Sequence, residues 1–437
     1  MLDETRTVLH SWCVQADWNA PTIVGGSGAR FCDSEGRTYL DMSSLAECAN
    51  LGHQHPAIVE AIQKQAQQLC FATAAWGAVP RARLAQLLLD KSGFQGGRVF
   101  FTLGGSDANE HAVKFARQVS GKPSGWIVTR DRSYHGSTYA AMALSGDART
   151  QHQVWAADFQ VRQVPPPYFY RCPFGSDSAL QCGQLAALHV GDVLDQLPSS
   201  NAAAVLMEPN AGTNGIVAPE NFWPLLREET RKRGVYLIAD EVMSGFGRCG
   251  EWFAWQRYGA EAKPDLMTLA KGLTGAHVPL GAVVISSEIA ATLEHQMLQT
   301  GLTYCGHPLA CAAGVAAVSA YDQENLIARS RELGARMFAE IFAMKNRVRV
   351  IGDVRGGHGL FAVVELVKDR MTREPVSAWP QQHPSMKALV ERGREAGVSF
   401  AVRGNLIILA PPLVIQENDL TDAIALLERL LTSLDWS

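Results

Sequence analysis

Short apolar runs alternate with stretches of helical periodicity between residues 56 and 286, and this alternation restricts the fold more than any other feature of the sequence. The run Tyr236-Leu237-Ile238-Ala239 is apolar throughout, which is typical of a strand buried on both faces. The pattern predicts strands at residues 98–102, 126–130, 203–207, 235–239, 265–269 and 282–286, and helices at 56–69, 80–91, 107–119 and 220–233. We therefore expect an α/β fold built on a mainly parallel sheet.

The pattern changes after about residue 305. A helix is predicted at 308–321, strands at 360–366, 398–402 and 406–409, and a closing helix at 419–434. We expect a large domain over residues 51–305 and a smaller α+β domain over 306–437, which the N-terminal segment 1–50 joins. Residues 165–183, which begin with three prolines, are predicted to be an irregular excursion.

Composition excludes several classes of protein. With 47% apolar and 19% charged residues, the 437-residue chain can bury a large core. The 39 basic and 43 acidic residues leave a net charge of −4, which does not suit nucleic-acid binding. The nine cysteines form no CxxC pair, so we expect neither disulfides nor a metal site but a reduced, cytoplasmic protein. No apolar run reaches the roughly 20 residues of a membrane span.

Reactive side chains follow three of the predicted strands. Asp240 follows the strand at 235–239, and Lys271 follows the strand at 265–269. The turn Leu103-Gly104-Gly105-Ser106-Asp107 opens a helix, and a helix N-terminus attracts phosphate. Ligands bind beyond the carboxyl ends of parallel strands. A lysine, an aspartate and a phosphate anchor at one edge are what pyridoxal phosphate (PLP) requires.

Several motifs resemble one known family. The segment Asp240-Glu241-Val242-Met243-Ser244-Gly245-Phe246-Gly247-Arg248, followed by Lys271, is similar to the signature of class III aminotransferases. Residues 36–41, 52–56, 105–110, 134–136, 208–209 and 303–308 add matches in the same order. The resemblance implies PLP fold type I and a homodimer with active sites at the subunit interface, with a tetramer left open. It is closest to the branch that transfers amino groups from amines, ω-amino acids and taurine to pyruvate.

The resemblance also implies a role for each matching residue. Lys271 would form the Schiff base with PLP and shuttle the proton, and Asp240 would pair with the pyridinium nitrogen. Tyr134 would stack on one face of the cofactor ring while Val242 packs against the other. Glu208 would lie near the ring edge. A ping-pong transfer from an amine donor to a keto acid such as pyruvate follows from these roles.

The remaining cofactor contacts concern the phosphate. Gly105 and Ser106 would hold it, and Thr303 of the partner subunit would complete the anchor. His135, in the Tyr-His-Gly motif, is also expected among the cofactor-binding residues. Considered alone, Tyr-His-Gly favours an ordinary turn with an aromatic neighbour over a cofactor contact.

Three residues are candidates for substrate binding. Glu47 occupies a position where amine transaminases often carry an aromatic residue, so it is expected to influence the choice of donor; alternatively it faces solvent or pairs with an arginine. Trp76 is either a pocket residue or part of the core. Arg403 is the candidate for binding the keto acid carboxylate, although the family pattern places that arginine slightly farther upstream.

Other interpretations of the sequence have less support. Gly245, Gly247 and Gly250 match the spacing of a dinucleotide fingerprint, but no helix start follows them, so an NAD-dependent oxidoreductase is not favoured. His53 and His55 are too few for a metal site. Decarboxylation, racemisation and an aminomutase reaction remain alternatives on the same scaffold. A catalytically silent homologue is disfavoured by the presence of both Lys271 and Asp240.

Overall fold

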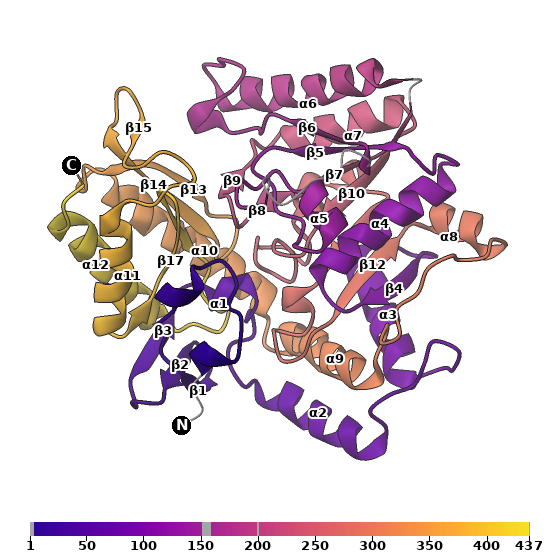
Figure 1. Cartoon of the computed structure of the whole chain (residues 1–437), viewed down its shortest axis with the longest axis horizontal. Coiled ribbons are helices and arrows are strands. Elements are labelled where there is room, and N and C mark those ends of the chain that lie inside the picture. The colour runs from indigo at the N-terminus through magenta and orange to yellow at the C-terminus, as the bar shows by residue number, and fades with distance from the viewer. Residues whose placement is uncertain (1–3, 151–158, 199–200, 437) are drawn as a thin grey trace.

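The computed structural model describes residues 4–150, 159–198 and 201–436. Its centre is a seven-stranded sheet in the order β4-β12-β11-β10-β7-β5-β6 (Figure 1). The strands are β4 (Arg98–Thr102), β5 (Trp126–Arg130), β6 (Val161–Val164), β7 (Ala202–Met207), β10 (Tyr236–Asp240), β11 (Leu266–Leu269) and β12 (Gly281–Ile285). Only β12 runs antiparallel to its neighbours, β11 and β4. The predicted α/β fold with a mainly parallel sheet is therefore confirmed.

Helices cover both faces of this sheet. On β10, Leu237 and Ala239 belong to the cluster that includes α6 and α7, whereas Ile238 packs with residues of α4 and α8 on the opposite face. Successive side chains of a strand point to opposite faces, so an entirely apolar strand needs cover on both. The helices around the sheet are α2 (Pro56–Gln68), α3 (Val79–Ser92), α4 (Gly105–Val119), α5 (Tyr139–Leu144), α6 (Ala179–Gln196), α7 (Phe222–Lys232), α8 (Ser287–Glu294) and α9 (Pro308–Gln323).

Besides a short two-stranded pair, β8 (Asn210–Ala211) with β9 (Ile216–Val217), the chain outside this sheet forms two smaller sheets. One, in the order β13-β14-β18-β17, packs with α10 and α12, while the other, β1-β2-β3-β16, joins the N-terminal strands to residues from near the C-terminus. These elements are β1 (Ile23–Ser27), β2 (Arg30–Asp33), β3 (Thr38–Asp41), α1 (Ser44–Glu47), α10 (Leu326–Met344), β13 (Ile351–Gly356), β14 (Ala362–Asp369), β15 (Glu374–Pro375), α11 (Pro384–Glu395), β16 (Val398–Ser399), β17 (Ala401–Arg403), β18 (Leu406–Leu409) and α12 (Glu417–Ser433). The expected domain boundary at residue 305 stays a prediction. The first helix beyond it, α9, packs against α2 and α3, which precede the boundary in the sequence.

The segment expected to be irregular is partly so. A short helical turn at Phe169–Arg171 interrupts it, and α6 begins at Ala179, inside the expected range. Tyr168 donates a hydrogen bond to Glu365 on β14, and Arg171 Nε donates to the same carboxylate at 2.7 Å. The segment therefore connects the large sheet to the smaller C-terminal one.

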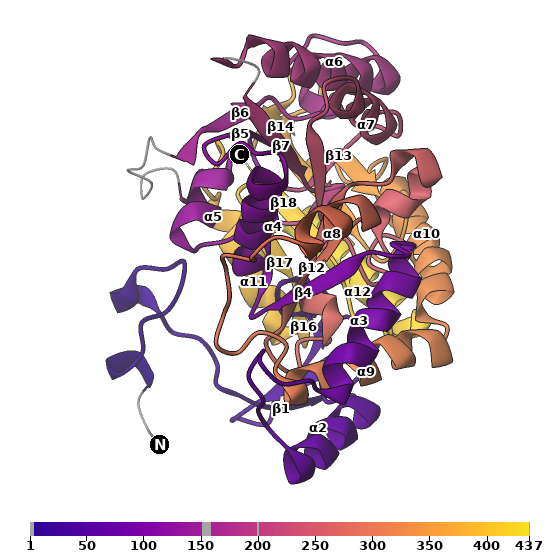
Figure 2. The same ribbon diagram turned by 90° about the vertical axis from the view of Figure 1, so that its right-hand side faces the viewer.

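The N-terminal residues lie outside the main body. Residues 4–20 stand apart from the rest of the ribbon in Figure 2, although Trp12 contacts Tyr134, with 6.2 Å between ring centroids. Among the described residues, no helix has the length and apolar character needed to cross a bilayer.

Candidate active site

A cavity of about 160 Å³ lies at the ends of the central strands. It is bounded by the N-terminus of α4, the loop after β5, the end of β10 and the segment after β11. Eight residues predicted from the sequence to bind the cofactor line it: Gly105, Ser106, Tyr134, His135, Glu208, Asp240, Val242 and Lys271. The structure thus brings together side chains that are far apart in the sequence.

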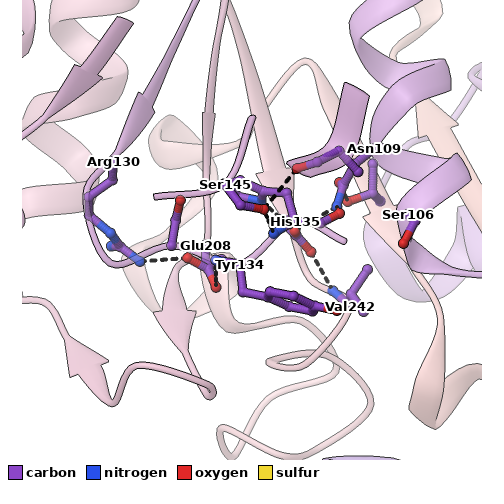
Figure 3. Close-up of polar contacts among 12 residues, drawn as sticks. Ser106, Asn109, Arg130, Tyr134, His135, Ser145, Glu208 and Val242 are labelled. Carbon is purple, nitrogen blue, oxygen red and sulfur yellow. Dashed lines mark hydrogen bonds and ion pairs between the residues drawn. The ribbon is translucent and has the colours of Figure 1, made fainter. Parts of the chain in front are cut away.

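Asp240 is the last residue of β10, and it is only 3% exposed. Its Oδ2 accepts a hydrogen bond from Asn109 Nδ2 at 2.8 Å and lies 2.7 Å from His135 Nδ1, and its Oδ1 accepts from the Val242 backbone N–H at 3.0 Å. Figure 3 shows these contacts around Asn109 and His135. Because a carboxylate only accepts, His135 carries its proton on Nδ1. The Asp240 charge is therefore fully hydrogen-bonded inside the protein.

Asn109 was not assigned a role from the sequence. Its Oδ1 accepts a hydrogen bond from Thr268 Oγ1 at 2.7 Å, while its amide nitrogen bonds both Asp240 and the His135 carbonyl. It lies one helical turn after Gly105 on α4, so it faces the same end of the sheet. The spacing of four residues between Gly105 and Asn109 is the sequence signal that indicates a place for Asn109 in the site.

The N-terminus of α4 forms an anion cradle against the loop after β5. The first N–H groups of a helix have no partner within the helix. Gly136 has φ +132°, and a Cβ there would lie 2.2 Å from Ser106 Oγ. A Cβ on Gly105 would lie 2.9 Å from Val242. The glycines therefore let the walls approach closely, and the cradle, Asp240 and Lys271 fit the phosphate, ring nitrogen and aldehyde of PLP.

Lys271 begins the short turn after β11 and has φ +43°, a left-handed conformation that is unusual for a lysine. Its Nζ lies 3.0 Å from Glu47 Oε2. Burial is the largest single influence and would by itself lower the pKa of Lys271, but the combined effects of Glu47, Cys48 and Asp240 outweigh burial, and the pKa is raised above its ordinary value. Glu47 thus neither faces solvent nor pairs with an arginine.

Glu208 pairs with Arg130, which the sequence analysis did not single out. Arg130 Nη2 lies 2.7 Å from Glu208 Oε2, and both residues are buried (Figure 3). Burial raises the pKa of Glu208, although the Arg130 charge opposes the shift. Glu208 Oε1 also accepts a hydrogen bond from the Tyr134 backbone N–H at 3.4 Å. The pair supports the loop that carries Tyr134.

Glu47 and the other three predicted residues are not among those that line this cavity. Trp76 is 73% exposed, so it does not belong to the core. Thr303 is also exposed. Arg403, on β17, is half-buried, and its Nη1 donates to the Val402 carbonyl at 3.0 Å. Their roles stay predictions.

The glycine motif and the histidine pair, which suggest other kinds of site in the sequence, form neither a dinucleotide site nor a shared metal site in the described residues. The glycines at 245–250 lie in turns and open no helix, so the geometry of a dinucleotide site is not formed there. His53 Nε2 lies 3.0 Å from Asp41, and His55 Nε2 lies 2.7 Å from Glu324, so the two rings bond to separate carboxylates. Pro56 begins α2, as predicted.

Comparisons with known proteins agree with the resemblance. Residues 15–431 match the family model "Aminotransferase class-III". The chain is 34% identical to leucine/methionine racemase of Thermococcus litoralis, covering 95% of this chain and 92% of that protein. It is 30% identical to taurine–pyruvate aminotransferase of Bilophila wadsworthia, covering 99% and 96%. The solved structure of taurine:2-oxoglutarate aminotransferase from Bifidobacterium kashiwanohense, with PLP and glutamate, is 37% identical with a TM-score of 0.92, covering 98% and 96%. The chain therefore belongs to the class III aminotransferases, which use PLP.

Proposed function

We propose that this aminotransferase moves an amino group from an amine or ω-amino acid donor to a keto acid, with pyruvate as the acceptor. The observation that carries the proposal is the convergence of Lys271, Asp240 and the α4 cradle on one cavity. Relatives named for taurine and pyruvate support this choice of donor and acceptor. The acceptor named for the Bifidobacterium enzyme is 2-oxoglutarate, so both keto acids belong in the test.

Bound PLP supplies an aldehyde that reacts with amines and a ring that takes up electrons when a C–H bond of the substrate breaks. Lys271 would provide the amine that holds the cofactor, and its free nitrogen would carry the proton that is transferred during the reaction. Asp240 keeps a proton on the ring nitrogen, because its own oxygens only accept and its charge favours a cation. His135 and Asn109 position Asp240.

The same cavity provides the remaining contacts. Gly105 and Ser106 would hold the phosphate at the start of α4, where the helix dipole favours an anion. Tyr134 would stack on one face of the ring. Val242, whose side chain lies 2.9 Å from where a Cβ on Gly105 would be, would close the other face. Glu208, paired with Arg130, would border the ring edge.

We also propose a homodimer with shared active sites. Trp76 and Thr303 lie on adjacent segments, which Arg81 connects by donating to the Trp76 and Gly306 carbonyls at 2.8 Å. Neither residue lines the cavity of its own chain, and nearby Val79 is 83% exposed. Such an apolar surface is typical of a subunit interface. A second copy seated on it would receive Thr303 at its phosphate site and Trp76 at its substrate pocket.

A cytoplasmic location is proposed on different grounds. All nine cysteines are free thiols, and proteins of oxidising compartments commonly pair theirs.

The test is a donor screen on purified protein reconstituted with PLP. Taurine, β-alanine, diamines and simple amines are each incubated with pyruvate or 2-oxoglutarate, and alanine, glutamate and the new carbonyl product are measured. We expect alanine to form with at least one donor and Lys271→Ala to abolish its formation while leaving the fold intact. Failure of every donor with both acceptors would overturn the proposal.

Racemisation is a second candidate, because one relative is named as a leucine/methionine racemase. A racemase inverts an amino acid without a keto acid acceptor and releases no carbonyl product. Incubating L-leucine and L-methionine with the holoenzyme alone and separating the enantiomers by chiral chromatography distinguishes the two reactions. We expect no D-isomer at a rate comparable to transamination.

A further inference from the structure

Glu47 forms a close ion pair with Lys271, a residue that lines the active-site cavity. Glu47 Oε2 lies 3.0 Å from Lys271 Nζ, and Glu47 is only 5% exposed. Among the described residues, no other cationic nitrogen lies within ion-pair distance of the Glu47 carboxylate. The Glu47 carboxylate therefore pairs with Lys271 and is shielded from water.

The backbone that presents Glu47 is strained. Residues 44–47 have φ values of +49°, +42°, +70° and +57°, although none of them is glycine. Each left-handed residue of this kind costs about 1–2 kcal/mol. Asp41 Oδ1 holds the turn by accepting the backbone N–H groups of Ser43 at 2.9 Å and Leu45 at 3.3 Å. Strain that the surroundings maintain is a common feature of functional positions.

A buried arginine braces the same turn without competing for Glu47. Arg248 Nη2 donates to Ser44 Oγ at 2.9 Å and to Asn50 Oδ1 at 2.8 Å, and its Nη1 donates to two backbone carbonyls. Ser44 Oγ in turn donates to the Ala410 carbonyl at 2.7 Å. Both terminal nitrogens of the guanidinium are therefore occupied, and neither pairs with Glu47.

The side chains that raise the pKa of Lys271 come from two places in the chain. Glu47 and Cys48 approach from the strained turn, and Asp240 approaches from the end of β10. Asp240 is already bonded to His135 and Asn109. Without Glu47, the burial that disfavours an ammonium would dominate.

We propose that Glu47 is a positioning residue that holds Lys271 as an ammonium whenever the lysine nitrogen is not attached to the cofactor. This inference rests on the proposed role of Lys271 in the aminotransferase. Only a neutral amine can attack a carbonyl or take a proton from carbon, so the Glu47 charge sets the pH at which Lys271 becomes reactive. It also keeps the free side chain beside the cavity.

The experiment uses the protein without PLP and does not measure turnover. The apoprotein is treated briefly with acetic anhydride at a series of pH values, and acetylation of the Lys271 peptide is quantified by mass spectrometry. In the wild-type protein, we expect the midpoint for Lys271 to lie above that of Lys64, an exposed lysine on α2 in the same digest. A lower midpoint for Lys271 than for Lys64 would overturn the proposal without any variant.

Variants then identify the source of the shift. Glu47→Gln should lower the Lys271 midpoint by about one to three pH units, because an opposite charge at this range shifts a pKa by that amount. Glu47→Asp, which keeps the charge on a shorter side chain, should lower it less. Glu60→Gln, on the exposed surface of α2, should leave it unchanged. A folded Glu47→Gln protein with the wild-type midpoint would contradict the proposal, whereas loss of transamination alone would bear only on the proposed function.

Discussion

At the scale of single residues, the carboxylate of Asp240 is the most constrained group in the site. Asn109, His135 and the Val242 backbone each donate to it, so both of its oxygens have partners inside the protein. Asp240→Asn should still bind PLP but reduce turnover by about 100-fold or more, because a neutral amide does not hold the pyridinium proton. Cofactor absorbance and initial rates measure the two effects, with exposed Asp177→Asn as the control. Unchanged turnover would remove Asp240 from the mechanism.

Substrate preference is also a property of single residues. Arg403 is half-buried, and its Nη1 bonds only a neighbouring carbonyl, so the guanidinium has capacity for a carboxylate. We expect Arg403→Ala to raise KM for pyruvate more than KM for the donor, and Glu47→Ala to change donor preference in addition to its effect on the reactivity of Lys271. Measuring the two half-reactions separately by cofactor absorbance tests both. An unaffected keto acid half-reaction in Arg403→Ala would mean that another cation binds the carboxylate.

Residue types at strand ends could be predicted, but their partners could not. Lys271 and Asp240 follow apolar strands, a signal visible in the sequence. Arg130 also lies at a strand end, as the last residue of β5, but its pairing with Glu208 depends on the adjacency of β5 and β7. The Glu47–Lys271 contact depends on a left-handed turn of non-glycine residues, which no local preference predicts.

At the scale of elements, the approach of α4 to the loop after β5 depends on one glycine. A Cβ on Gly136 would lie 2.2 Å from Ser106 Oγ and 2.7 Å from Ser106 Cα. Gly136→Ala should therefore displace the phosphate cradle and raise the Kd for PLP about tenfold or more, since a displaced charged hydrogen bond costs about 1.5–3 kcal/mol. Fluorescence titration of the apoprotein with PLP provides the measurement.

Gly121→Ala is the matched control for this experiment. Gly121 also has a positive φ, +65°, but a Cβ there would meet nothing within 4 Å. It carries the backbone strain without the collision. Equal weakening of PLP binding in both variants would show that the strain of a left-handed alanine, rather than contact with Ser106, causes the loss.

The strands with continuous apolar character were predicted within about two residues, because burial on both faces leaves a strong signal. β6 was missed: its sequence Val-Arg-Gln-Val is half polar, as an edge strand permits. The strand predicted at 398–402 is two strands, β16 and β17, which pair with different sheets. A local pattern does not specify which sheet a short strand joins.

At the scale of the whole molecule, stability should depend on His358, in the connection between β13 and β14. Burial lowers its pKa from 6.5 to about 4, and Arg257 adds to the effect. The unfolded chain then binds a proton below pH 6.5 that the folded chain does not bind until about pH 4. The free energy of unfolding should fall by up to about 2 kcal/mol between pH 7 and pH 5.

Urea denaturation at the two pH values measures this loss. His358→Gln should show a loss smaller by about the same 2 kcal/mol, since glutamine does not titrate. His295→Gln, at an exposed position, should behave as the wild type. A wild-type pH dependence in His358→Gln would assign the effect to other groups.

The arrangement of subunits decides whether each site is complete. Thr303 is exposed and does not line the cavity of its own chain, so its hydroxyl is expected at the phosphate of the neighbouring site. Thr303→Ala should weaken PLP binding by about 1.5–3 kcal/mol, the contribution of a hydrogen bond to a charged group. Equilibrium dialysis of the variant against PLP measures this change.

Hybrid dimers of Thr303→Ala and Lys271→Ala chains test the sharing itself. If sites are shared, each hybrid contains one site with Lys271 from one chain and Thr303 from the other, both intact, and one site with both defects. Random mixing in equal amounts should then restore about a quarter of the wild-type sites, because half of the dimers are hybrids with one intact site each. Two different affinity tags isolate the hybrids, and activity at limiting PLP reports intact sites. If each chain supplied both residues to its own site, every site in the hybrid would carry one defect, and mixing would restore none.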